Sequence, residues 1–162
     1  MSEAETNMST MQGDLATELR RLSDIEAIKA LKARFIRLAD AKDWEAWGRE
    51  VLAEDCHIHN DAGPIDGRAR IVELTSQALA DASATHWLYA PEIAITGPDT
   101  ASAIWPVSDH ISLVFKGAPM VVRGWGHYHD DYVRTADGWR LLRCRLVRQH
   151  VERLTGADAE RA

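Results

Sequence analysis

The sequence has only two cysteines, Cys56 and Cys144, and no long apolar run. Two cysteines are too few for a disulfide scaffold or a CxxC site, so we expect a reducing, cytoplasmic setting. No apolar stretch reaches the roughly 18 residues that a transmembrane helix needs. The polar, acidic residues 1–13 do not read as a secretory signal. We therefore expect neither a membrane protein nor a signal-bearing secreted protein.

The sequence also lacks a strong excess of one charge. Its formal net charge is −6, and acids near the two ends supply about two thirds of that value. The body between them is close to neutral and has no cluster of Lys and Arg. Because nucleic-acid binding depends on such clusters, we expect no nucleic-acid partner.

The remaining composition is that of a soluble globular protein, with 46% apolar and 27% charged residues in 162. This length suits one domain. We predict a disordered lead-in over residues 1–13, a single domain over residues 14–155, and a flexible tail over residues 156–162. No internal repeat or linker interrupts the domain.

The first half of the domain has the apolar spacing of helices. From Asp14 the apolar residues recur at steps of three and four, which predicts an amphipathic helix ending near Lys42. Its stripe consists of Leu15, Leu19, Leu22, Ile25, Ile28, Leu31, Phe35 and Leu38. Ser23 and Glu26 form a capping box, so a fresh helix could start at Ser23. Shorter helices are predicted from residue 43 and over residues 67–82.

The second half has the pattern of strands. Residues 92–95, 101–115, 120–135 and 139–151 are expected to be extended, with Gly-Pro-Asp, Gly-Ala-Pro and Ala-Asp-Gly turns between them. Helices followed by consecutive antiparallel strands predict an α+β fold, with the helices packed on one face of a bent sheet.

Seven histidines are the most unusual feature of the sequence. His57 and His59 would share one face of a strand, either as half of a metal site or on an outer face. No HExxH or cysteine pattern supplies further ligands, so we expect no metal. In the segment 126–130, His127 and His129 share one face and Tyr128 and Asp130 share the other. Which face points inward is open at this point.

Two charged positions also have more than one interpretation. Arg143 alternates with apolar residues, so it either lies at a rim with its stem buried or reaches into a pocket. Asp40 falls at the C-terminal end of the long helix, where the helix dipole disfavours an acid. An acid held there usually has a partner, and a histidine is the obvious candidate.

Several segments together resemble a known family. They are residues 21–29 and 40–44, Gly67 before a helix, Thr85-His86 with residues 90–93, and Gly126-His127-Tyr128 leading to residues 137–139. Over about residues 20–150 the chain resembles SnoaL-like proteins of the nuclear-transport-factor-2-like superfamily, especially the bile acid 7α-dehydratase and scytalone dehydratase-like proteins. The resemblance implies a cone, in which a curved antiparallel sheet wraps around a long N-terminal helix and opens to an apolar pocket.

The same resemblance implies a site. Its motif positions fall on Asp40 and His86, where neutral His86 takes a proton and Asp40 holds the tautomer of the imidazole. No cofactor is implied. The positions that it implies as substrate-binding are Phe35, Ile58, Asn60, Trp105, Asp109, Trp125, His127 and Arg143. Phe35 stands where the bile acid enzyme has a catalytic tyrosine, and His127 and Arg143 are expected to replace that polar function. An arginine there would favour a carboxylate or phenolate substrate.

The sequence thus predicts a cofactor-independent lyase of the dehydratase type, acting on a hydrophobic ring compound such as a steroid, polyketide or lignin-like aromatic. Isomerisation, halide loss and retro-aldol cleavage use the same first step and stay open. A non-catalytic ligand-binding protein, or the small subunit of an aromatic-ring dioxygenase, is the alternative from another class. The uncovered stripe at Leu15, Leu19 and Leu22 predicts a homo-oligomer. The resemblance favours a trimer, with a dimer as the second choice.

Overall fold

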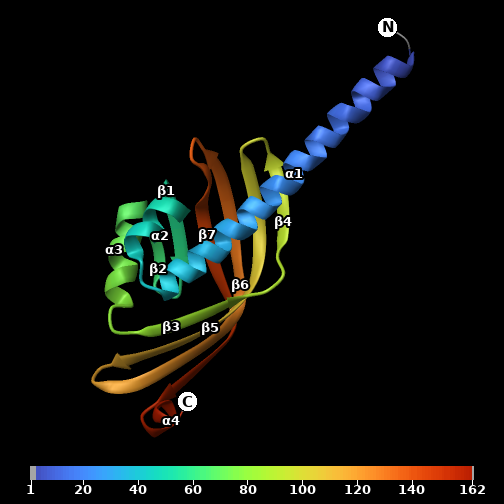
Figure 1. Cartoon of the computed structure of the whole chain (residues 1–162). Helices are drawn as coiled ribbons and strands as arrows, with labels where there is room; N and C mark the ends of the chain where they lie inside the picture. The colour runs from blue at the N-terminus through green and yellow to red at the C-terminus, as the bar shows by residue number, and fades with distance from the viewer. Residues whose placement is uncertain (1–2, 162) are drawn as a thin grey trace.

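The first helix is longer and straighter than the sequence pattern indicates. The computed structural model describes residues 3–161, with side chains for residue 8 and residues 11–161, and α1 runs over Glu3–Asp40 without a break at Ser23. Residues 3–13, expected to be disordered, continue this helix, whereas residues 1–2 lie outside the described part. The stretch contains good helix formers and places acids near the N-terminus, where the helix dipole favours them. The N-terminal half of α1 projects well beyond the sheet (Figure 1).

Two shorter helices flank the C-terminal end of α1. Helix α2 is Trp44–Val51, and its N-cap Asp43 accepts a hydrogen bond from the backbone N–H of Ala46 at 3.2 Å. Helix α3 is Arg68–Ala78 and contacts α2 and β1. Of the helices that the structure describes, none is both long and apolar enough to span a membrane.

Seven strands of the described chain form one sheet, in the order β2-β1-β7-β6-β5-β3, with β4 also on β5. The strands are β1 Leu52–Asn60, β2 Gly63–Asp66, β3 Ser83–Leu88, β4 Glu92–Gly97, β5 Thr100–Phe115, β6 Ala118–Thr135 and β7 Gly138–Thr155. The sheet is mixed rather than wholly antiparallel, because β1 pairs with β7 in parallel. Strand β1 thus lies beside β7, the last strand of the chain. The pattern of consecutive strands in the sequence did not reveal this parallel pairing.

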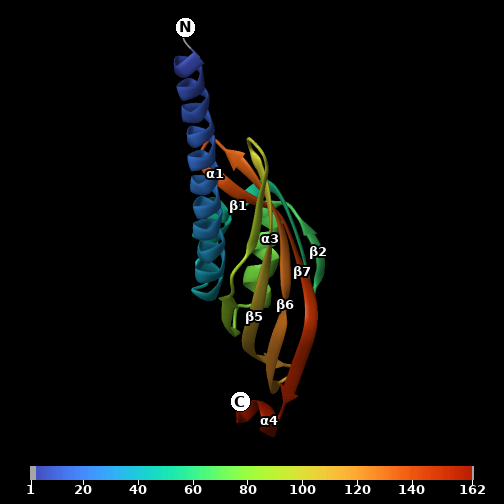
Figure 2. The ribbon, with the colours of Figure 1, turned by 90° about the vertical axis from the view of Figure 1, so that its right-hand side faces the viewer.

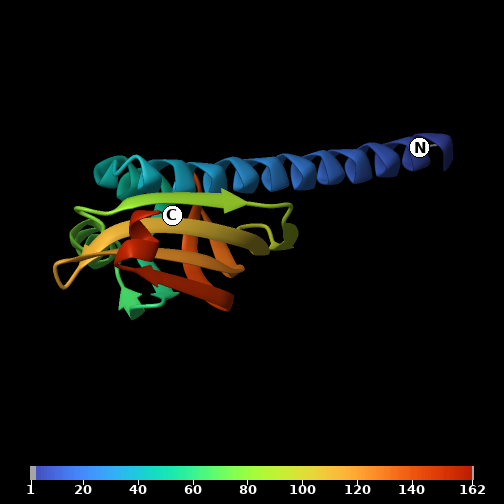
Figure 3. The ribbon, with the colours of Figure 1, turned by 90° about the horizontal axis from the view of Figure 1, so that it is seen from below.

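The three longest strands give the sheet its curvature. Strands β5, β6 and β7 have 16, 18 and 18 residues, and β3 and β4 pair with different stretches of β5. The β6–β7 register shifts at Trp125/Gly126 and at Asp131/Tyr132. Such irregularities bend a sheet. Helix α1 lies across one face of the curved sheet (Figures 2 and 3).

The alternation along β6 shows which face is the interior. Tyr128, Asp130 and Tyr132 are buried, whereas His129 is exposed. The interior face therefore carries the tyrosines and Asp130, and the histidines of this strand face outward. This answers the question that the segment 126–130 left open.

The C-terminal tail also has structure. Helix α4 spans Ala157–Glu160, and the N–H of Gly156 donates to the carbonyl of Pro119 at 3.2 Å. Ala159 is buried against the end of the β6–β7 pair. These contacts tie residues 156–161 to the sheet, although a flexible tail was expected; Ala162 lies outside the described part.

Candidate functional site

Asp40 and His86 lie in contact where the end of α1 meets β3. The Nδ1 atom of His86 is 2.6 Å from Asp40 Oδ1, and the backbone N–H of His86 donates to Asp40 Oδ2 at 3.0 Å. Both carboxylate oxygens are thus held by one residue, which offsets the unfavourable helix dipole at this position. The side chains keep 22% and 13% of their exposure, so both remain accessible.

This arrangement orients the imidazole. With Asp40 accepting from Nδ1–H, the Nε2 atom of neutral His86 carries the lone pair. Within residues 3–161 no group forms a hydrogen bond with that Nε2. The geometry therefore offers a base whose tautomer is set by a carboxylate, and it can take a proton from a molecule placed beside Nε2.

A second charged cluster lies next to His86 on the same face. Asp109 is the register partner of His86 across β3 and β5, and it forms an ion pair with Arg148 of β7. Arg148 also donates from Nη2 and Nε to Asp61 Oδ2 at 3.0 and 3.1 Å. Burial alone lowers the pKa of Arg148, but its hydrogen bonds to Asp109 and Asp61 outweigh burial and raise that pKa. The arginine is permanently charged and held by two acids.

The ion pair between Arg148 and Asp109 occupies space that is free because residue 124 is a glycine without a side chain. A Cβ atom at residue 124 would overlap Arg148 Nη1 and lie 2.9 Å from Asp109 Oδ1. Arg148 was not among the residues singled out from the sequence. The signal was available in the alternation of β7, where Arg148 has the same parity as Cys144 and Leu146, but the register needed to use it comes only from the folded sheet.

The opposite end of the interior is closed by a buried polar network. Lys32 Nζ is 2.8 Å from Asp130 Oδ2, and both side chains are fully buried. The Tyr132 hydroxyl donates to the same oxygen at 2.6 Å and accepts from Trp105 Nε1 at 3.0 Å. Burial and the charge of Asp130 raise the pKa of Tyr132. Every charge here has a partner, so this end is structural and Trp105 belongs to it.

The two cysteines lie in the same closed region. Burial raises the pKa of Cys56 to about 12, and burial also raises that of Cys144. A thiol that stays protonated is a poor nucleophile and a poor metal ligand. Neither cysteine contributes reactive chemistry.

Most of the other predicted interior positions do lie between the helix and the sheet. Ile58 is buried with 6% exposure opposite Cys144, and Phe35 packs against Trp47 and Tyr128. Asn60 follows Ile58 at the same parity and accepts from the N–H of Ala62 at 2.9 Å. This bond shapes the turn that carries Asp61 to Arg148.

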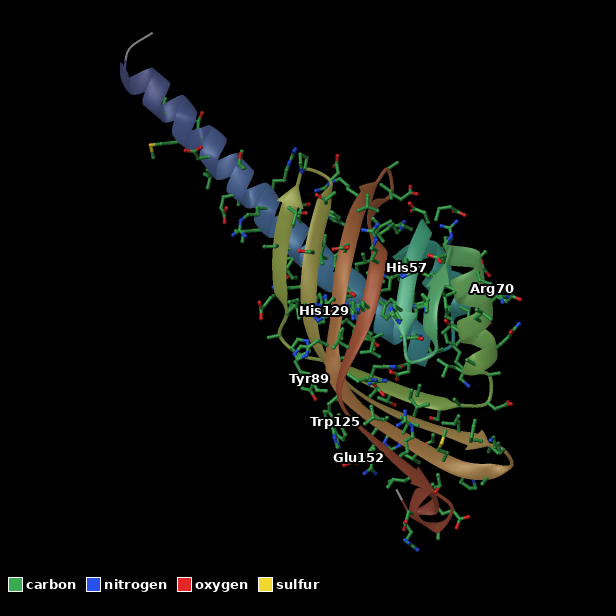
Figure 4. The ribbon with its side chains drawn as sticks, turned by 180° about the vertical axis from the view of Figure 1, so that it is seen from behind. His57, Arg70, Tyr89, Trp125, His129 and Glu152 are labelled. Atoms are coloured by element: carbon green, nitrogen blue, oxygen red, sulfur yellow. The ribbon has the colours of Figure 1, made fainter. Side chains whose placement is uncertain are left out.

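Three predicted pocket residues lie on the outer face instead. Arg143 is 66% exposed and pairs with Asp131, and Trp125 stacks on His150 with ring centroids 5.4 Å apart. Trp125 and the labelled His129 are visible on the sheet face that points away from α1 (Figure 4). The prediction that Trp125, His127 and Arg143 line the interior pocket was wrong, and the strand register gives the reason. Trp105 pairs with Tyr128, so odd-numbered residues of β6, Trp125 and His127 among them, face away from Trp105.

The outer face carries a hollow of about 700 Å³. Its lining includes His57, His59, His129, Arg143 and Arg145. His57 is held by Asp66 at 2.5 Å. Across residues 3–161, no group of three or more His, Cys, Asp or Glu side chains is placed to hold a metal ion.

Fold and interior together define a small α+β protein in which a helix and a curved sheet enclose an acid–base pair. Residues 20–145 match the family described as the SnoaL-like domain, and the chain belongs to this family, which is part of the nuclear-transport-factor-2-like superfamily.

Comparisons with individual proteins agree with this assignment. The probable cyclase FGR4 of Gibberella zeae is 24% identical over 132 residues, which cover 75% of this chain and 88% of that protein. A candidate scytalone dehydratase from Novosphingobium aromaticivorans has a TM-score of 0.71 at 16% identity, covering 82% of this chain and 88% of the other. The dehydrochlorinase LinA-type3 from Novosphingobium barchaimii has a TM-score of 0.72 at 16% identity, covering 85% and 94%. At these identities the two structures show a shared fold.

Proposed function

We propose that this protein is a cofactor-independent lyase of the dehydratase type that acts on a hydrophobic ring compound. The observation that carries the proposal is the contact between Asp40 and His86, with both carboxylate oxygens engaged and Nε2 unengaged. A base oriented in this way is suited to remove a proton from carbon. Membership in a family that includes enzymes acting on small molecules supports the same conclusion.

In the proposed reaction, neutral His86 takes a proton from a carbon next to a conjugated system. Asp40 stabilises the imidazolium that forms, because it accepts a hydrogen bond from Nδ1–H in both states. The imidazolium then returns the proton to the departing hydroxide, which leaves as water. One proton and one hydroxide leave the substrate as water, and His86 returns to its neutral form, so no further reactant is needed.

The cluster beside His86 bears on which substrates fit. Arg148 is neutralised by Asp109 and Asp61 and Asp40 adds a negative charge, so this part of the interior is acidic while His86 is neutral. An anionic group near His86 would be repelled. Arg143, proposed from the sequence to receive a carboxylate, points away. We therefore propose a neutral ring substrate.

The test uses solvent deuterium. Ring ketones with a β-hydroxyl group, and hexachlorocyclohexane as a halide-bearing probe, are incubated in D2O with the protein, and exchange and elimination are followed by NMR. We expect His86→Gln and Asp40→Asn to reduce both rates about 10²- to 10⁴-fold. His127→Gln, a matched histidine change on the outer face, should leave them unchanged.

Two results would contradict the proposal. One is a His86→Gln variant that folds normally and turns over the probes at the rate of the unmodified protein. The other is unmodified protein that binds the probes but neither exchanges nor eliminates, which would favour the ligand-binding alternative. Isomerisation or retro-aldol products would keep the role of His86 and change only the second step.

A further inference from the structure

The hollow on the outer face of the sheet, called the outer hollow below, contains a row of basic side chains without partners. His59, Arg145 and His129 lie directly opposite one another on β1, β7 and β6. All three are exposed, and among the described residues no group forms a hydrogen bond or an ion pair with them. Arg145 is always charged, and a proton on either histidine adds a like charge opposite it, which destabilises a sheet. The row therefore favours an anionic neighbour from outside the chain.

The rest of the outer hollow is partly balanced and partly apolar. In the neighbouring row, Arg143 lies between His57 and Asp131, with its Nη1 atom 3.7 Å from Asp131 Oδ2. His57 is in turn held by Asp66. Toward β4 and β5 the lining consists of Ile93, Ala94, Ala103 and Ile104 alongside Glu92. The outer hollow thus combines a basic end on β1, β7 and β6 with a mainly apolar end on β4 and β5.

The projecting part of α1, residues 3–22, has the complementary character and is called the arm below. Its apolar stripe from Met8 to Leu22 is exposed to solvent. Residues 1–19 contain no Lys or Arg, and their acids are Glu3, Glu5, Asp14 and Glu18. Asp14 and Glu18 each follow a stripe residue by three positions, so on the helix they lie beside the stripe. An apolar stripe with acids along its edge matches a hollow that is apolar at one end and basic at the other.

The arm can reach an outer hollow only in another copy of the chain. Helix α1 lies across the opposite face of the sheet and continues straight past its edge (Figures 2 and 3). The five strands under the outer hollow span about 19 Å, a length that a helix covers with about 13 residues. The segment from Met8 to Leu22 is therefore long enough to cross the outer hollow along its two rows.

We infer that the arm of one chain docks in the outer hollow of a neighbouring copy. The stripe covers the apolar end, and the acids beside it face Arg145 and its flanking histidines. Each chain then gives an arm and receives one, so two different surfaces meet in every contact. Contacts of this kind close into a ring when the rotation between copies allows it, and a ring of three is the trimer that the resemblance implies. The inference does not depend on the proposed function.

Light scattering of full-length variants tests the two surfaces one at a time. Arg145→Glu reverses the central charge of the unpaired row, and Leu15→Glu with Leu19→Glu places charges in the stripe. We expect each of these variants to have the mass of a single chain, with an unchanged circular dichroism spectrum. Arg70→Glu is the matched control, because it makes the same charge change at an exposed position of α3. Its mass should equal that of the unmodified protein.

Mixing the two variants tests whether the arm and the outer hollow bind each other. The stripe variant keeps an intact outer hollow, and Arg145→Glu keeps an intact arm, so one contact can form between the two proteins. We expect an equimolar mixture to contain a species with the mass of two chains. A chain that carries all three substitutions, mixed with either variant in a separate control, should give only one of the two intact surfaces and form no such species.

Four results would overturn the inference. If Arg145→Glu keeps the mass of the unmodified protein, the arms bind one another instead. If the stripe variant keeps that mass, the sheet face of a second copy covers the outer hollow. Unmodified protein with the mass of one chain, or a mixture that contains only single chains, would show that the arm does not bind this surface.

Discussion

At the scale of single residues, the interior contains two kinds of polar group: fully buried groups that bond one another, and partly exposed groups. Lys32, Asp130 and Tyr132 are bonded to one another and fully enclosed. Asp40 and His86 keep some exposure, and no described group forms a hydrogen bond with His86 Nε2. A buried charge without a partner is costly, so the contact between Lys32 and Asp130 offsets the cost of burying both charges.

Gly124 provides a prediction at this scale. Gly124→Ala should lower the free energy of unfolding by about 1–3 kcal/mol, because the added methyl group overlaps the Arg148 guanidinium and forces the ion pair with Asp109 apart. Thermal unfolding of the purified variant measures the change. Gly13→Ala is the control, since no atom lies within 4 Å of the new methyl group and alanine favours a helix. Equal melting temperatures for Gly124→Ala and unmodified protein would show that Arg148 can move aside at no cost.

At the scale of elements, one aspartate fastens the long helix to the sheet. Asp24 of α1 accepts from Arg134 Nη2 at 2.7 Å and from Trp139 Nε1 at 3.1 Å, so it joins the helix to both strands of the β6–β7 hairpin. Burial alone raises the pKa of Asp24, but the hydrogen bonds from Arg134 and Trp139 outweigh burial and lower it. The position of the helix across the sheet therefore depends on an ionised carboxylate.

This anchor predicts a pH dependence. The pKa of Asp24 is lower in the folded chain than in the unfolded chain, so its stabilisation is present above the unfolded value of about 4 and is lost as the pH falls through the folded value. Asp24→Asn should cost about 1.5–3 kcal/mol at pH 7. The difference from unmodified protein should shrink at pH 3, as measured by urea unfolding. Asp14→Asn, an exposed acid on the same helix, is the control; a cost for Asp24→Asn that is equal at both pH values would contradict the anchor.

At the scale of the whole molecule, the projecting half of α1 is the part that its own domain does not cover. Its large apolar side chains are 48–69% exposed: Met8, Met11, Leu15, Leu19 and Leu22. Figure 1 shows that this part of the helix extends away from the sheet. An exposed apolar stripe of this kind is typical of a surface that binds a partner, and we expect the partner to be further copies of this chain.

Light scattering tests this expectation. Unmodified protein should have the mass of a trimer, or of a dimer, and Leu15→Glu combined with Leu19→Glu should lower that mass because charges replace the apolar contacts. Thr17→Glu, on the opposite side of the helix, should leave the mass unchanged. A doubly substituted protein with the mass of the unmodified protein would show that another surface joins the copies.

The sequence by itself determined the α+β plan and the long strands of the second half. These features follow from local periodicity and turn residues, which depend on neighbours along the chain. The family, and His86 as the partner of Asp40, were predicted from the resemblance of its motifs to SnoaL-like proteins. The sequence did not determine that residues 3–13 continue α1, because weak apolar patterning does not exclude a helix.

Only the tertiary structure decided which side chains share the interior. Trp125, His127 and Arg143 were assigned to the pocket, and the β5–β6 and β6–β7 registers place them on the outer face. Side chains alternate along a strand, so a shift of one residue in register exchanges the two faces, and no local signal sets that shift. For the same reason Arg148 emerged only in the folded sheet, where a distant strand brings it beside Asp109.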